Sequence, residues 1–492
     1  MVEAPSPRSN PVGYPLRRLS HDSQVSTNLL SAEKGTDRRD SWSVAVKVIV
    51  VHALRHDSRL TTLEHALCFA RHSYGCEVTY VNIFGRIPTE LDSTSYDLVV
   101  LTYDLAAQRT MPFWKALTKR LAPLMASARV RVVMPQDDYS YSAHLDDFIA
   151  DYGIDYVFSP LTRDLPMLYP RSITRGVQFC EAFTGYWESE TSLPFSSFRR
   201  PFAERSIDLG QRVRFLPPQL GSTAQRKGQL AVLFAALADQ EGFSCDVSTR
   251  TSDMLIGDAW WRFLGDIRFT VGRLGGASVA DPRGRLHAKV MQLELRKPSI
   301  GHDKISRRLR TNRLPLGNFT ALSPRLFECA AMGVCQVLEE AHYVDDFEPW
   351  RHYIPLAPDM SNTSEVFEAM RDWERCQEIV TSAEEVLIHS GRHSYRQFVK
   401  RFLNICVGHD IDNGDTPVVR DLDETLFPEQ DLESAEHVRA IARRLAIRNR
   451  YMGSDPVSES ARTWVDHFRR RELIVESFTI PWCAAKPLLR TS

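Results

Sequence analysis

The chain has 492 residues, enough for two or three domains that each bury their own core. Its 61 lysines and arginines balance 62 aspartates and glutamates, which argues against a nucleic-acid partner, because duplex binders carry a basic excess. Nine cysteines without a C-x-x-C pair favour reduced thiols over disulfides or a zinc site. No apolar run reaches the roughly 18 to 20 residues that span a bilayer, and no secretory signal is visible, so we expect a cytoplasmic protein.

Strands and helices alternate along the first part of the chain. Residues 1–43, rich in Ser, Pro, Arg and Asp, predict a disordered tail. Apolar runs then predict strands at 46–51, 77–83, 97–102, 129–134 and 156–159. Helical periodicity falls between them, at 59–72, 112–126 and 144–152. This alternation is typical of a parallel sheet with right-handed crossovers.

A second alternating run follows an irregular, proline-rich segment at 161–220. It comprises a helix at 225–240, strands at 243–248 and 266–271, a helix–strand unit at 322–338, a strand at 353–356, and helices at 364–372 and 374–403. We therefore predict the fold class α/β, with two Rossmann-like doubly wound domains facing a cleft. The predicted divisions are a tail (1–43), two Rossmann-like domains (44–200 and 201–408) and a helical C-terminal extension (409–492).

The segment L-S-P-R-L-F-E-C-A-A-M-G-V-C-Q-V-L at 322–338 carries the clearest chemical signal. We predict a helix capped by Ser323, whose N-terminus and Arg325 together form an anion site. Glu328, one turn further in, is then placed to accept hydrogen bonds from a ribose or sugar hydroxyl. The alternative is a capped amphipathic helix with surface charges.

Two further groups lie where strands are predicted to end. Gly275, Gly276 and Ser278 follow the strand at 266–271, and small residues there let backbone N–H groups approach a pyrophosphate; an ordinary turn is the alternative. In the first domain His52, Asp137 and Asp138 follow strands and are candidates for acceptor binding or general-base catalysis. A structural histidine and a helix cap are the competing interpretations. We expect only one of the two adjacent carboxylates to face the site.

Several short motifs, taken in order, resemble one family. They are M-P-Q-D-D-Y (134–139), G-I-D-Y-V-F-S-P and F-T-G-Y-W (within 153–187), R-S-I-D-L-G (205–210), G-G-A-S-V-A-D-P-R-G (275–284), S-P-R-L-F-E (323–328) and H-Y-I-P-L-A-P-D-M-S-N (352–362). In order and spacing they are similar to bacterial glycosyltransferases with two Rossmann domains (GT-B), related to the group-1 retaining family. Within these, the chain resembles a poorly characterised set found with surface-polysaccharide genes.

The resemblance implies roles for particular residues. Glu328 matches the second glutamate of the family's paired-glutamate motif, which holds the donor ribose, whereas the position of the first glutamate is Thr320. Leu274 likewise stands where the related set tends to have an acidic residue. Arg226 and Lys227 match a basic pair that neutralises the donor diphosphate, with a solvated charge pair as the alternative. Asn362 lies in a loop that borders the donor in the family, although helix capping alone explains it.

The implied activity is transfer of a sugar, with retention, from a nucleotide-sugar in the second domain to a glycan or lipid-linked acceptor in the first. A tightly bound cofactor or metal is not expected, because basic groups hold the diphosphate and no metal-ligand cluster is visible. A basic amphipathic helix at 434–450 suggests peripheral contact with the inner membrane face, with packing on its own protein as the alternative. A sugar-nucleotide epimerase and a non-catalytic binding subunit are the rival functions. A dehydrogenase is disfavoured, because no G-x-G-x-x-G opens either domain.

Overall fold

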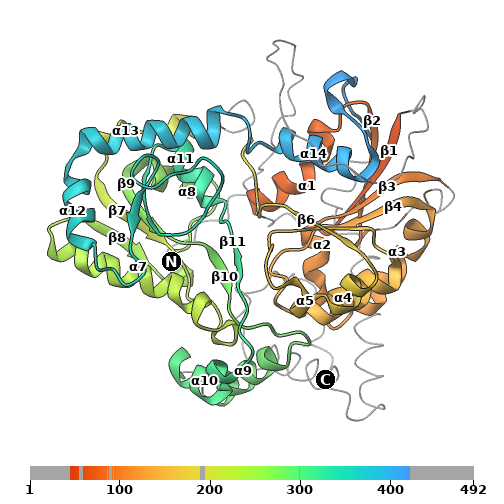
Figure 1. Cartoon of the computed structure of the whole chain (residues 1–492), viewed down its shortest axis with the longest axis horizontal. Helices are drawn as coiled ribbons and strands as arrows, with labels where there is room; N and C mark the ends of the chain where they lie inside the picture. The colour runs from red at the N-terminus through yellow and green to blue at the C-terminus, as the bar shows by residue number, and fades with distance from the viewer. Residues whose placement is uncertain are drawn as a thin grey trace, which may run out of the picture. The chain divides into compact units, whose positions relative to one another are not determined.

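The computed structural model describes residues 45–420 except 55–58, 86, 88–90, 92–93, 189–193 and 298–299. The predicted tail at 1–43 and the predicted helix at 434–450 lie outside the described residues. The described chain forms two parallel sheets, each accompanied by helices (Figure 1).

The first sheet contains seven strands in the order β14-β2-β1-β3-β4-β5-β6, and all neighbouring pairs are parallel. They are β1 (Val46–His52), β2 (Cys76–Asn82), β3 (Tyr96–Leu101), β4 (Ala128–Val133), β5 (Tyr156–Ser159), β6 (Gln178–Glu181) and β14 (Val418–Arg420). Residues 48–51 of β1 are completely buried, as expected for a parallel strand covered on both faces.

Helices cover both faces of this sheet, so alternate side chains of β1 enter different cores. Ile49 and Val51 pack in the core that includes residues of α3 (Trp114–Ser127) and α4 (Ser142–Tyr152). Val48 and Val50 instead join residues of α1 (Leu60–His72) and α14 (Tyr395–Val407). The short helices α2 (Tyr103–Ala107), α5 (Leu165–Leu168) and α6 (Pro170–Thr174) complete this region.

The second sheet has five parallel strands in the order β13-β12-β9-β7-β8. They are β7 (Ile207–Arg212), β8 (Cys245–Ser248), β9 (Ile267–Gly272), β12 (Cys335–Glu339) and β13 (Ile354–Leu356). Its helices are α7 (Ser222–Gln240), α8 (Asp258–Asp266), α11 (Arg325–Ala331), α12 (Thr363–Arg371) and α13 (Trp373–Glu384). Numbered in chain order, the second sheet reads 2-1-3-4-5, and the first sheet reads 2-1-3-4-5-6 with its last strand, β14, added beside β2. Both are doubly wound arrangements, so the predicted fold class is confirmed.

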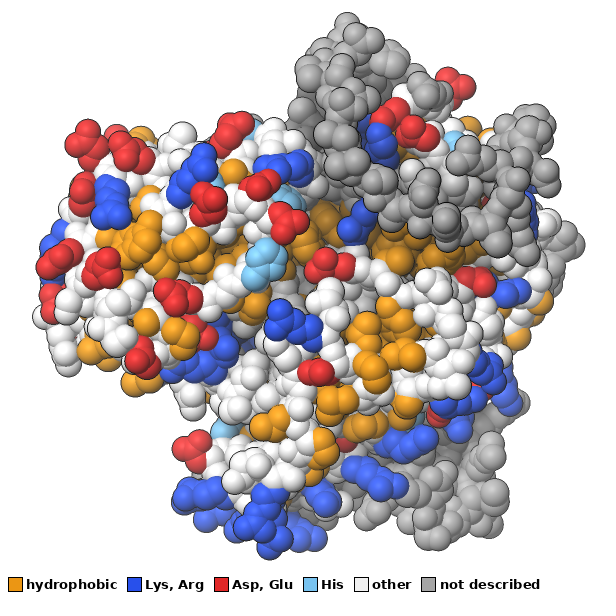
Figure 2. Space-filling model, viewed as in Figure 1, with side chains coloured by type: hydrophobic (Ala, Val, Ile, Leu, Met, Phe, Trp, Pro, Cys, Tyr) orange, Lys and Arg blue, Asp and Glu red, His pale blue; other side chains and the backbone are white. Residues whose placement is uncertain are grey.

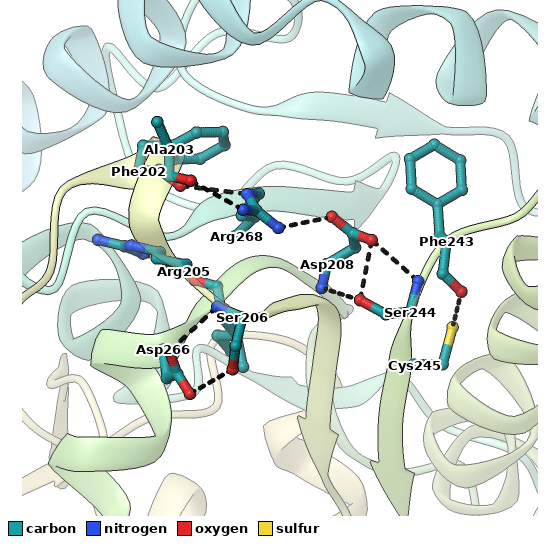
Figure 3. A network of polar contacts seen from close by, with 11 residues as sticks. Phe202, Ala203, Arg205, Ser206, Asp208, Phe243, Ser244, Cys245, Asp266 and Arg268 are labelled. Carbon is teal, nitrogen blue, oxygen red and sulfur yellow. Dashed lines mark hydrogen bonds and ion pairs between the residues drawn. The ribbon is translucent and has the colours of Figure 1, made fainter.

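The strand β7 lies in the segment that we predicted to be irregular, because its sequence I-D-L-G-Q-R is largely polar. Figure 3 shows how polar contacts secure it. Asp208 accepts hydrogen bonds from Arg268 Nη1 at 2.8 Å and from the backbone N–H and hydroxyl of Ser244, both at 2.9 Å. The buried Arg205 donates to the carbonyl oxygens of Ile267 and Met332, both at 2.7 Å. The R-S-I-D-L-G motif therefore serves to hold this strand.

The chain returns to the first sheet near its described end. The predicted helix at 374–403 is in fact broken: α13 ends at Glu384, a π-helical turn follows, and Gly391 adopts a left-handed φ of 67° before α14 begins. The residues of α14 then pack in a core of the first sheet, and β14 pairs with β2 at its edge. Both elements thus belong, by their contacts, to the first sheet, a return that the sequence did not predict.

A small antiparallel ribbon stands apart from both sheets. It pairs β10 (Gly275–Ala277) with β11 (Phe319–Ala321), and the chain between them forms α9 (Arg285–Arg296) and α10 (His302–Leu309). No described helix is long and apolar enough to cross a membrane. Among the described residues no group of three or more potential metal ligands was found.

Candidate active site

A pocket opens where β7 and β9, the strands at the topological switch point of the second sheet, end. Ligands of doubly wound proteins bind at this position, because the connections leave the two strands in opposite directions. The cavity volume is about 40 Å³, the space of roughly three water molecules. A ligand larger than this must displace side chains or extend onto the open surface. The polar residues that line the pocket are Gln211, Lys227, Trp260, Thr270, Arg273, Ser323, Arg325, Gln336 and Tyr343.

Lys227 reaches this pocket from the second turn of α7. Its ammonium lies 3.6 Å from the point that a Cβ on Gly275 would occupy, so the ribbon's first glycine leaves room for it. No hydrogen bond or ion pair joins this ammonium to any other described residue. Burial lowers the pKa of Lys227 to about 7, with Arg325 and Arg273 adding to the effect and Asp137 opposing it. Lys227 is therefore a partly buried cation among other cations.

Arg325 is the first residue of α11 and lies in the same pocket. Its Nη1 donates to Oε1 of Gln211 at 2.9 Å, and its guanidinium carbon lies 5.2 Å from the ring centroid of Trp260. Burial lowers the pKa of Arg325. The predicted cap at Ser323 is wrong, because Pro324 occupies the N-cap position and no side chain caps the helix. With only seven residues, α11 contributes little dipole, so Arg325 itself supplies the positive charge.

Glu328 lies one turn further along α11, as predicted. Its Oε2 accepts a hydrogen bond from Nε1 of Trp260 at 3.0 Å. Burial raises the pKa of the Glu328 carboxyl, and the neighbouring Arg325 and the Trp260 bond oppose that rise. Trp260 of α8 therefore fixes one oxygen of the Glu328 carboxylate. Glu328 also lies near Arg325, which α11 places in the pocket.

Arg226 has a different position from Lys227, although the two are adjacent in sequence. Its Nε donates to Oε2 of the buried Glu339 at 3.0 Å, and its Nη2 donates to the carbonyl of Pro358. Arg273 lies 2.8 Å from the other oxygen of the same carboxylate. Arg226 is thus occupied in an ion-pair network at the end of β12, and of the predicted basic pair only Lys227 lines the pocket.

The glycine-rich segment is not the open phosphate loop that we predicted. Gly275 and Gly276 form a strand, with Gly276 paired to Thr320 in the ribbon. Gly276 has a φ of 132°, and a Cβ there would lie 2.0 Å from the carbonyl oxygen of Phe319. Close backbone approach therefore requires glycine. The buried Ser278 hydroxyl lies at the N-terminus of α7, 3.4 Å from the backbone N of Thr223, and is not in the pocket lining.

The two aspartates after β4 have separate environments. Asp137 is exposed and adopts a left-handed φ of 53°. The buried Arg109 stabilises this turn by donating to the carbonyls of Gln136 and Asp137 at 2.8 and 2.7 Å. Asp138 is completely buried and accepts hydrogen bonds from the hydroxyls of Ser159 and Tyr169 at 2.6 and 2.5 Å. Asp138 therefore belongs to the core and cannot contact a substrate, whereas Asp137 acts electrostatically on Lys227.

His52 and Asn362 also have structural environments. His52 is fully buried at the end of β1, and burial lowers its pKa to about 3, so the ring is neutral. Its Nδ1 accepts from the backbone N–H of Leu54 at 3.3 Å. The Asn362 side chain bonds the N–H of Ala357 and the carbonyl of Pro355 at 2.8 and 3.0 Å, closing the loop after β13. Neither is in the pocket lining.

Six of the polar residues that line the pocket were missed from the sequence, and three of them contact or neighbour the predicted site residues. Gln211 lies at the end of the unpredicted β7, Trp260 lies on α8, and Arg273 directly follows β9. Of these, only Arg273 carried a usable signal, since it lies two residues after the end of the strand predicted at 266–271. Gln211 and Trp260 are defined by contacts with residues more than 60 positions away, at Arg325 and Glu328.

No protein-family model matches the chain, and no curated protein matches its sequence. Solved structures resemble it in fold. HepE of Anabaena, solved with UDP and glucose, is 9% identical over 73% of this chain and 100% of its own, with a TM-score of 0.40. An alpha1,3-fucosyltransferase is 10% identical over 78% of this chain and 96% of its own, with a TM-score of 0.38. TarM is 9% identical over 63% of this chain, which spans 54% of TarM, with a TM-score of 0.33. Likeness at this level is weak, and the function proposed below rests on the residues of this chain.

Proposed function

We propose that the chain is a glycosyltransferase that takes a sugar from a nucleotide-sugar whose diphosphate binds between Lys227 and Arg325. The observation that carries the proposal is the convergence of these two cations at the switch point of the second sheet. A diphosphate supplies the negative charge that such a site lacks, and an arginine fork and a lysine point charge are suited to phosphate oxygens.

The charge balance of the pocket favours an anion over a neutral ligand. No carboxylate bonds Lys227 among the described residues, and Arg325 donates to the neutral amide of Gln211. Asp137 and Glu328 act on these cations through their charge alone. Burial is the main cause of the lowered pKa of both residues, and for Lys227 the nearby charges of Arg325 and Arg273 add repulsion. A bound diphosphate would relieve this repulsion and restore the charge on Lys227.

Glu328 would contact the ribose or sugar of the same donor. A carboxylate fixed through one oxygen by Trp260 can accept a hydroxyl hydrogen bond through the other. In this arrangement the cations stabilise the charge that develops on the leaving nucleoside diphosphate. No metal or tightly bound cofactor is needed for that step.

Asp137 is the candidate for contact with the acceptor or the transferred sugar. It is exposed, follows β4 of the first sheet and acts electrostatically on Lys227, so its carboxylate lies near the proposed diphosphate. The proposal includes retention of anomeric configuration and an acceptor that is a glycan or is lipid-linked, as the sequence resemblance implies.

The test is release of nucleoside diphosphate from a panel of nucleotide-sugars, measured with and without pooled glycan and lipid-linked acceptors. We expect acceptor-stimulated release from one donor and its loss in Glu328→Ala. Conversion of a donor into its epimer without any acceptor would contradict the proposal and support an epimerase.

A second candidate, a nucleotide-binding subunit without catalytic activity, is favoured by one observation. Thr320 stands eight residues before Glu328, where the related family has its first glutamate, and its hydroxyl donates to Asn318 at 2.8 Å. A threonine cannot supply the carboxylate that acts on the transferred sugar in that family. Nucleotide binding that depends on Lys227, without release from any donor, would favour this candidate.

A further inference from the structure

The insertion between β10 and β11 carries a concentrated positive charge. Residues 285–313 include nine lysines and arginines and two acidic residues, an excess of seven, whereas the whole chain is close to neutral. They form α9 and α10 with a short 3-10 turn, and we call this segment the basic helical pair. Figure 2 shows Lys and Arg side chains gathered over these helices, at the lower end of the molecule in that view.

These cations are available to a partner outside the chain. All nine are exposed, and none forms an ion pair with another described residue. They are Arg285, Lys289, Arg296, Lys297, Lys304, Arg307, Arg308, Arg310 and Arg313. Like charges on neighbouring helical turns repel one another and contribute no folding energy, so stability alone does not explain their accumulation.

The apolar side chains of the basic helical pair are turned inward. Val290, Ile300 and Ile305 form a small separate core, and Leu293 and Leu309 pack against it. The pair is also fixed to α7, because His302 Nδ1 lies 3.3 Å from Oε1 of Gln225, two residues before Lys227. The cations therefore project from a supported platform next to the helix that carries the candidate site.

An exposed aliphatic side chain lies beside this charge. Leu316 is 59% exposed and follows Arg313 in the loop that leads to β11. A leucine next to a group of cations fits the interface of a lipid bilayer, where cations meet anionic headgroups and the leucine enters the acyl boundary. A water-soluble polyanion would have no use for the leucine.

We propose that the basic helical pair docks the protein on the surface of an anionic lipid bilayer. Docking would bring α7 and the pocket close to the membrane, where a lipid-linked acceptor would lie. This last step rests on the proposed glycosyltransferase function, whereas the docking itself does not.

The experiment is co-flotation of the full-length protein with vesicles of phosphatidylcholine alone or mixed with phosphatidylglycerol. The test variant combines Lys304→Gln, Arg307→Gln and Arg308→Gln, which are exposed positions on α10. The matched control combines Arg250→Gln, Arg351→Gln and Arg375→Gln, which are exposed and lie outside the basic helical pair. Both variants remove three positive charges, and their thermal midpoints verify folding.

We expect the wild type to float only with anionic vesicles and to be released by salt. Each removed charge should lower partitioning onto the vesicles about fivefold, so the test variant should partition on the order of a hundredfold less than the wild type. The control variant should lose much less. Leu316→Ser should weaken vesicle binding but not binding to dextran sulfate.

Failure of the wild type to bind, or equal losses in both triple variants, would overturn the proposal. Binding to dextran sulfate without vesicle binding would assign the surface to a soluble polyanion instead. Because vesicle binding needs no donor, its failure is distinct from failure of the proposed function.

Discussion

The indole Nε1 of Trp260 donates a hydrogen bond to Oε2 of Glu328 at 3.0 Å and so joins α8 to α11. Glu328 was predicted from its place on a short helix, but its partner was not. The pair shows how this site is assembled, because a carboxylate from one helix is fixed by an aromatic side chain from another.

Trp260→Phe should therefore destabilise the protein by about 1.5–3 kcal/mol, the usual range for a hydrogen bond to a charged group. Phenylalanine keeps an aromatic ring beneath Arg325, removes the N–H and is smaller than the indole, and the control below measures the effect of that difference in size. Urea denaturation measures the loss, and Trp373→Phe, at a position that is 37% exposed, is the control. In a Glu328→Gln background the cost should be smaller. An equal cost in both backgrounds would mean that the indole stabilises something other than this carboxylate.

Donor affinity should fall as the pH rises above about 7. The pKa of Lys227 is about 7 in the free protein against an ordinary 10.5, so the ammonium loses its charge in this range. The diphosphate of a nucleotide-sugar is fully ionised from about pH 7 upward and the common bases titrate only above about pH 9, so the change in this range belongs to the protein. We expect a loss approaching tenfold per pH unit between about 7.5 and 9, measured by calorimetric titration. In Lys227→Arg, which stays charged, the affinity should not change with pH.

The same lysine gives the stability of the free protein a pH dependence with the opposite sign. Between about 7 and 10.5 the unfolded chain binds the Lys227 proton more tightly than the folded one, so this residue's contribution to stability rises with pH. For binding, the contradicting result is an affinity for the nucleotide-sugar that increases with pH in the wild type, because the protonated Lys227 would then not hold the diphosphate.

Gly276→Ala should destabilise the protein by about 3–5 kcal/mol, because the new Cβ would lie 2.0 Å from the Phe319 carbonyl oxygen and φ is 132°. Gly242→Ala is the matched control, since its φ is also positive, at 86°, but a Cβ there meets nothing within 4 Å. We expect that control to cost only about 1–2 kcal/mol. Thermal and urea unfolding measure both, and similar costs would show that the ribbon yields to the added methyl group.

Much of the fold could be predicted from the sequence because parallel strands buried on both faces have continuous apolar runs. Residues 46–51 illustrate this, and the observed β1 extends from Val46 to His52. The prediction missed β7, whose polar residues are stabilised by distant partners such as Arg268. It also missed the return of the chain to the first sheet through α14, since periodicity does not indicate which sheet a helix covers.

The site was harder to predict than the fold, because position along a strand or helix does not fix where a side chain points. Arg226 and Lys227 are adjacent on α7, yet one bonds Glu339 and only the other lines the pocket. Asp137 and Asp138 divide in the same way between surface and core. In both pairs, contacts with elements that are remote in sequence decide where each side chain points.

Because their environments differ, substitutions of the two aspartates should have opposite effects on stability and turnover. Asp137→Asn should change the unfolding free energy little, since asparagine tolerates a left-handed φ and its Oδ1 can still accept the Tyr139 hydroxyl, but it should reduce acceptor-dependent turnover. Asp138→Ala should cost about 2–5 kcal/mol, because it leaves the buried hydroxyls of Ser159 and Tyr169 without their acceptor. Denaturation combined with the diphosphate-release assay separates the two effects. A stable Asp138→Ala protein would contradict the assignment of that carboxylate to the core.

The most direct measurement is thermal unfolding of the wild type, Lys227→Met and Arg226→Met with a panel of nucleoside diphosphates and their sugars. We predict that one nucleotide, at about 100 times its dissociation constant, stabilises the wild type by roughly 2.7 kcal/mol. Lys227→Met should lose this stabilisation without being less stable when free, whereas Arg226→Met should be less stable when free and keep it. No stabilisation of the wild type by any nucleotide, or equal stabilisation of the wild type and Lys227→Met, would contradict a diphosphate site between Lys227 and Arg325.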